Sequence, residues 1–130
     1  EQAEAKILFD RLDQYAMSMD AKASGLEKEN PVKACQAYRE LALLFAGDDW
    51  GKQANEKIKA IQKQNTYKNE EIAWKAYEAV ETQYNALPQA PGTSRTNSLN
   101  TIKANLKTVA DKYPDTAGGR ASKSLLDSAK

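Results

Sequence analysis

Histidine is absent from this 130-residue chain, and cysteine occurs only once, at Cys35. The absence of histidine removes the commonest general base and the commonest zinc ligand of proteins. A single cysteine forms no intramolecular disulfide and no thiolate metal cluster. We therefore expect no metal site, no cofactor and no catalytic residues. Cys35 itself is expected to be a buried, inert side chain, because no histidine is present to activate it.

The chain also lacks a long hydrophobic run and an excess of charge of either sign. No stretch of 18 apolar residues exists, so we expect no membrane span. The chain has 19 Lys and Arg residues and 18 Asp and Glu residues. A dedicated nucleic-acid binder carries a denser stripe of basic residues, so we expect no nucleic-acid partner. A hydrophobic fraction of 41% and a charged fraction of 28% are ordinary for a globular protein, and the length suits one domain, residues 1–130.

Apolar residues recur at the spacing of an amphipathic helix through most of the chain. This spacing predicts irregular helices over 3–26 and 67–87, and repeat-like helical units over 33–66 and 102–130. No segment shows the period-2 alternation of a strand, so the predicted fold class is all-α. The polar stretch 62–69 contains neither Gly nor Pro. The number of helices is therefore six, or five if this stretch joins two of them.

Two local signals predict where helices begin and end. Asn30 followed by Pro31 is a typical helix start, because Asn caps free N–H groups and Pro suits the first helical position. Gly47 is well placed to end the helix that follows in the left-handed conformation.

One hydrophobic spacing occurs twice, and the two copies are 68 residues apart. The first copy consists of Tyr38, Leu41, Ala42, Phe45, Ala54, Ile58 and Ile61, and the second of Leu106, Val109, Ala110, Tyr113, Ser122, Leu126 and Ala129. Gly51 and Gly119 align at the same offset, each in the first turn of the second helix of its copy. A unit that repeats in this way is a helical hairpin, which buries its apolar face by stacking on neighbours. This pattern favours a scaffold over a catalyst.

The repeated spacing resembles the tetratricopeptide family, in which a bulky residue is followed by a Leu, a small residue and an aromatic, and then by a second helix. The turn Tyr113-Pro114-Asp115-Thr116 looks like turns common in tetratricopeptide-like proteins of the bacterial envelope. The middle of the chain departs from the family pattern, because Glu81 stands where a small residue is expected. The resemblance implies antiparallel helical hairpins in one right-handed array. An irregular helical bundle is the alternative fold.

Similarity to this family also implies a function and a place in the cell. We expect a non-enzymatic scaffold or adaptor that binds a protein or peptide partner in a concave groove. The alternative is an oligomerisation or spacer module of a larger exported protein. An oligomerisation module would form a homo-oligomer. An enzyme would need a carboxylate-only or substrate-assisted mechanism. Because the chain begins at Glu1, we expect either a mature form after signal removal or a domain of a longer chain. The expected compartment is the periplasm or cell envelope, although a lone thiol fits the cytosol equally well.

Three aromatic residues are the candidate partner-binding residues: Trp50, Tyr67 and Trp74. Tyr67 and Trp74 are seven residues apart and so share one side of a helix, with Trp74 at the edge of the apolar stripe. Trp and Tyr dominate interface hot spots, which favours a patch that anchors a partner. Packing between helices is the alternative for all three.

Two acidic pairs and one glycine pair have simpler explanations than a site. Asp48-Asp49 and Glu70-Glu71 lie near predicted helix starts, where carboxylates favour the positive end of the dipole. Gly118-Gly119-Arg120 also opens a helix, but it lacks the strand-loop-helix context and the Lys of a phosphate loop.

Overall fold

The computed structural model describes residues 1–129, and these residues form six α-helices and no strand. The helices are α1 (Gln2–Leu26), α2 (Pro31–Leu44), α3 (Asp49–Gln62), α4 (Tyr67–Asn85), α5 (Thr93–Lys112) and α6 (Ala117–Ser128). The prediction of an all-α chain is confirmed. The polar stretch after residue 62 is a break, because α3 ends at Gln62 and α4 begins at Tyr67.

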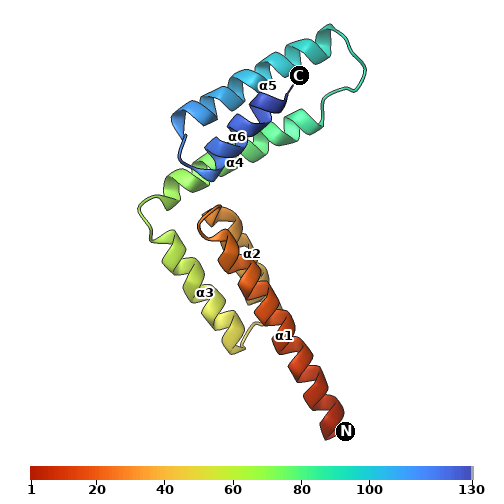
Figure 1. Ribbon diagram of the computed structural model, residues 1–130, viewed down its shortest axis with the longest axis vertical. Helices are drawn as coiled ribbons and strands as arrows, with labels where there is room; N and C mark the ends of the chain where they lie inside the picture. Colours follow the sequence, from red (N-terminus) through yellow and green to blue (C-terminus); the bar gives the residue numbers. More distant parts are fainter. Residues whose placement is uncertain (130) are drawn as a thin grey trace. The chain divides into compact units, whose positions relative to one another are not determined.

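The chain divides into two compact units, Glu1–Tyr67 and Lys68–Lys130. The first unit contains α1, α2 and α3, and the second contains nearly all of α4 together with α5 and α6 (Figure 1). Within each unit, consecutive helices are joined by short connections and run antiparallel. The single domain expected over residues 1–130 stays a prediction.

The predicted helix start at Asn30 is present in the first unit. The Asn30 side-chain oxygen accepts a hydrogen bond from the backbone N–H of Lys33 at 3.1 Å, and Pro31 occupies the first helical position. At the end of α2, Gly47 has a φ of +84°, which is the left-handed conformation that glycine adopts without strain. These two residues turn the chain so that α2 packs on both α1 and α3.

The core of the first unit lies on α2. The side chains of Cys35, Tyr38 and Leu41 are completely buried there, as is Ala54 on α3. Full burial of Cys35 confirms its predicted place in the core. Two further contacts fix the pairing of α1 with α2 and α3. The Tyr38 hydroxyl donates to Glu27 Oε1 at 2.7 Å, and Lys57 Nζ forms an ion pair with Asp20 at 2.6 Å.

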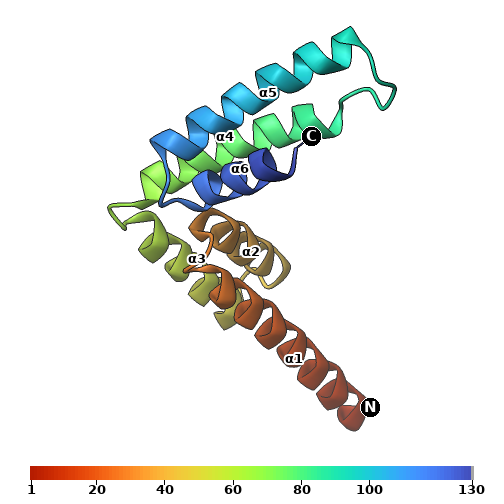
Figure 2. The same ribbon diagram turned by 45° about the horizontal axis from the view of Figure 1, so that its top comes forward.

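The second unit packs α5 against α6 and also brings α4 onto the start of α6 (Figure 2). A Cβ atom on Gly118 would overlap the backbone of Ala73, so this glycine allows α4 and α6 to touch backbone to backbone. Glu70 Oε2 on α4 accepts a hydrogen bond from the N–H of Ala117 at 3.0 Å. Glu70 therefore places its negative charge at the positive end of α6, in addition to lying in the first turn of its own helix.

The two predicted hairpins are built in the same way. Asp48 caps α3 and Thr116 caps α6, and these caps are 68 residues apart, like the hydrophobic spacing itself. Ala54 and Ser122, which occupy the matching small-residue position, are both completely buried. The pairs α2–α3 and α5–α6 are also the close helix contacts expected for two hairpins. The two hairpins therefore share an N-cap and a buried small residue at one offset of 68 residues.

Candidate functional site

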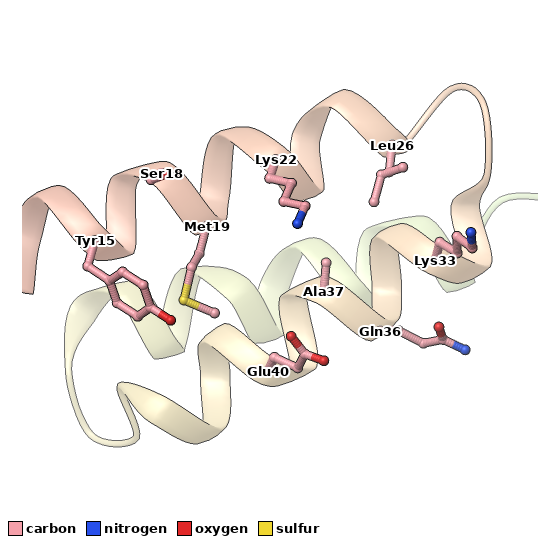
Figure 3. A pocket seen from close by; sticks show the side chains of 9 residues that line it. All are labelled: Tyr15, Ser18, Met19, Lys22, Leu26, Lys33, Gln36, Ala37 and Glu40. Carbon is pink, nitrogen blue, oxygen red and sulfur yellow. The ribbon is translucent and has the colours of Figure 1, made fainter.

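A groove of about 420 Å³ lies between α1 and α2 in the first unit (Figure 3). Its lining residues on α1 are Tyr15, Ser18, Met19, Lys22 and Leu26, and those on α2 are Lys33, Gln36, Ala37 and Glu40. The spacing of each set by three or four residues places it on one face of its helix. The groove is thus a consequence of two amphipathic helices whose facing residues do not fill the space between them.

The floor and rim of the groove differ in chemistry. Met19 on α1 and Ala37 on α2 are half-buried in the groove, whereas Lys22 and Glu40 are exposed. Met19 and Lys22 both point from α1 toward α2 (Figure 3). Lys22 on α1 and Glu40 on α2 supply charges of opposite sign among the lining residues. A thioether is adaptable in shape, so a floor of Met and Ala accepts side chains of several shapes. The arrangement suits an amphipathic segment that presents an apolar side to the floor and charges to the rim.

The groove residues were not identified from the sequence. Tyr15 and Met19 belong to the apolar stripe of the first predicted helix, but such a stripe marks core and groove alike. A sequence signal did exist on α2, because Lys33, Gln36 and Glu40 share a polar face with Ala37. Only the packing of α1 shows that this face borders a hollow.

Trp50 lies in the first turn of α3 and is half-buried. Its indole Nε1 donates a hydrogen bond to Asp13 Oδ1 on α1 at 3.1 Å. The backbone N–H of Trp50 also donates to the capping Asp48 carboxylate at 3.2 Å. Trp50 therefore ties the start of α3 to α1, and part of its ring reaches solvent.

Tyr67 and Trp74 are more than nine-tenths buried, at 8% and 7% exposed. Trp74 packs its ring against Tyr77, with 5.1 Å between the ring centroids. Trp50 and Tyr67 belong to the first unit and Trp74 to the second. The assignment of the three aromatics to a partner surface stays a prediction, and the burial of Tyr67 and Trp74 favours the packing alternative for those two.

At the start of α6, the N–H groups of Ala117 and Gly119 are engaged in hydrogen bonds. The N–H of Gly119 donates to Thr116 Oγ1 at 2.9 Å, and the N–H of Ala117 donates to Glu70. The Arg120 guanidinium donates to the carbonyl of Asp115 at 2.7 Å. These bonds cap the start of α6 and join it to α4.

Two tyrosines carry perturbed pKa values. Burial, together with the hydrogen bond to Glu81 at 2.6 Å, raises the pKa of Tyr77 to about 12. Burial, followed by the hydrogen bond to Glu27, raises the pKa of Tyr38 well above its usual value. Both phenols are thereby held in the protonated form as hydrogen-bond donors. Neither lines the groove, so these shifts belong to the packing of each unit.

Within residues 1–129, no cluster of three or more His, Cys, Asp or Glu residues has a geometry that could hold a metal ion. None of the six helices combines the length and the apolar character that crossing a membrane requires. Comparison with protein-family models, with curated proteins and with solved structures found no match to this chain.

Proposed function

We propose that this protein is a non-enzymatic interaction scaffold built from tetratricopeptide-like hairpins. The observation that carries the proposal is the duplicated construction of α2–α3 and α5–α6, in which cap, small residue and glycine recur at one offset. Hairpin repeats of this kind serve as extended binding surfaces, because each unit exposes helix faces that its neighbours do not cover.

The groove between α1 and α2 is the binding surface proposed for the scaffold. Its partner is a peptide or protein segment with an apolar side and charged flanks, since the floor contains Met19 and Ala37 and the rim contains Lys22 and Glu40. Such a segment fits as an amphipathic helix whose side chains, three or four residues apart, follow the groove.

Selection of peptides from a displayed library tests this proposal. Ala37→Arg would fill the groove with a long charged side chain, whereas Ala21→Arg changes an exposed alanine on α1 outside the groove. We expect selected peptides to bind the parent protein and the Ala21→Arg variant alike and to lose affinity for the Ala37→Arg variant. Fluorescence anisotropy with labelled peptides measures this difference. Peptides that bind all three proteins equally would place the binding surface elsewhere.

A further inference from the structure

The three charged residues that line the α1–α2 groove are ordered along it. Lys22 and Lys33 line the half next to the connection between α1 and α2, whereas Glu40 lines the half farther from that connection. Figure 3 shows Lys33 near the connection and Glu40 farther along α2. Lys33 and Glu40 are seven residues apart, so they share one face of α2 and lie about 10 Å apart along its axis. The groove therefore has a basic end and an acidic end.

The hairpin construction does not require the two charges on α2. At the offset of 68 residues, the positions of α5 that match Lys33 and Glu40 are Thr101 and Thr108. Each threonine hydroxyl donates to a carbonyl of the preceding turn of α5, at 3.2 and 3.0 Å. Thr101 also lines a groove between α4 and α5, and the described residues that line that groove are all uncharged. Charge is therefore a property of the α1–α2 groove and not of the fold.

We propose that the α1–α2 groove selects a helical segment of a partner protein that carries one acidic and one basic residue seven positions apart. This inference rests on the proposed function of the groove. Residues seven apart on a bound helix share a face and lie about 10 Å apart, which matches the separation of Lys33 and Glu40. The acidic residue of the partner lies beside Lys33, with Lys22 on the opposite rim, and the basic residue lies beside Glu40. Apolar side chains between the two charges reach Met19 and Ala37 on the floor.

Both charges of the partner contribute because the two ends of the groove differ in sign. A segment with two charges of one sign is attracted at one end and repelled at the other. The three charged residues of the groove are exposed, so each ion pair contributes a factor of about 1.5 to 5 in affinity. Salt screens such exposed pairs, so the selection should weaken as the ionic strength rises.

Four synthetic peptide helices with blocked ends test the proposal by fluorescence anisotropy with the full chain. They share one sequence of Leu, Ala and Gln and differ only at two sites seven positions apart. These sites carry Glu and Lys, two Glu, two Lys, or two Gln. We expect the peptide with Glu and Lys to bind the parent protein at least about threefold more tightly than the peptides with two Glu or two Lys. It should also bind more tightly than the peptide with two Gln.

Reversal of one charge in the groove tests the assignment of its acidic end. Glu40→Lys makes all three charged residues of the groove positive, so it should shift the preference to the peptide with two Glu. Glu56→Lys is the matched control, because it makes the same change of charge at an exposed residue of α3 outside the groove. The control should keep the preference of the parent. Circular dichroism melting establishes that both variants are folded.

The outcomes separate this inference from the proposed function. If the four peptides bind the parent equally and all lose affinity for the Ala37→Arg variant, the groove binds helices without selecting their charges. That result would overturn the inference and leave the proposed function standing, as would a Glu40→Lys variant that keeps the preference of the parent. Binding that Ala37→Arg leaves unchanged, or no binding of any of the four peptides, would contradict the proposed function of the groove and this inference with it.

Discussion

Gly119 lies so close to Tyr113 that a Cβ atom at this position would overlap the Tyr113 carbonyl oxygen. The same relationship joins Gly51 to the carbonyl of Phe45, 68 residues earlier in the chain. In each hairpin the second helix therefore begins in contact with the end of the first, and only a residue without a side chain fits. The two glycines are steric requirements of the hairpin turn.

We expect Gly51→Ala and Gly119→Ala each to lower the free energy of unfolding by roughly 1–3 kcal/mol, the usual cost of forcing extra volume into a packed site. Urea denaturation monitored by circular dichroism measures the change. Gly25→Ala is the matched control, since nothing lies within 4 Å of a Cβ at Gly25 in α1. Alanine there should raise stability by about 0.5–1 kcal/mol through helix propensity. Equal effects at all three positions would show that the close approach is absent.

The sequence predicted the hairpins well because their determinants are local. Caps, a left-handed glycine and apolar spacing all act within a few residues, so the ends of α2 and the start of α3 follow from Asn30, Gly47 and Asp48. The sequence does not decide between a break and a continuous helix at the α3–α4 junction, because residues 62–69 contain neither Gly nor Pro. The chain there still leaves the helix, with turn residues between Gln62 and Tyr67.

The candidate groove and the exposed start of α1 were harder to foresee because both depend on how one helix packs on another. The stripe on α1 looks uniform in sequence, yet Ala16 is buried and Leu8 is exposed. Their exposure differs because α2 is shorter than α1 and covers only part of the stripe. This difference depends on both helices, so it is not visible in the sequence of α1 alone. The same limit applies to Trp74, whose place at the edge of a stripe gave no sign of its burial against Tyr77.

Ser122 is expected to be a weak point in the second hairpin. Its hydroxyl is buried and has no hydrogen-bond partner among residues 1–129, whereas the matching position of the first hairpin is Ala54. A buried hydroxyl left without a partner costs about 1–3 kcal/mol, so Ser122→Ala should raise the free energy of unfolding by about 1 kcal/mol. Ser124→Ala on the exposed side of α6 measures the contribution of helix propensity alone. The prediction fails if Ser122→Ala gains no more than this control.

Alkaline pH should destabilise the fold through Tyr38 and Tyr77. Both pKa values are raised above that of an unfolded tyrosine, about 10, so the unfolded chain ionises first as the pH rises. The stability that these phenols contribute is complete below about pH 10 and is lost progressively as the pH rises toward 12 and beyond. The maximum slope is about 1.4 kcal/mol per pH unit for each tyrosine.

Denaturation curves at pH 9, 10 and 11 measure this slope, and Tyr77→Phe should reduce it while removing only a hydroxyl group. Absorbance of the phenolate gives a second measurement, because Tyr38 and Tyr77 should ionise above the usual tyrosine pKa of about 10. The same slope in the parent and the Tyr77→Phe variant would mean that this phenol ionises as readily in the folded state as in the unfolded state.

The two tryptophans should differ in their access to solvent. Trp74 is 7% exposed, while Trp50 is half-buried and bonded to Asp13 on α1. Acrylamide should therefore quench the fluorescence of the Trp74→Phe variant, in which Trp50 remains, far more than that of the Trp50→Phe variant. If Trp50 also belongs to a partner surface, its quenching should fall when a selected peptide binds. Quenching that falls as the protein itself is concentrated would instead indicate self-association through the surface around Trp50. Equal protection of both indoles under every condition would remove Trp50 from any binding surface.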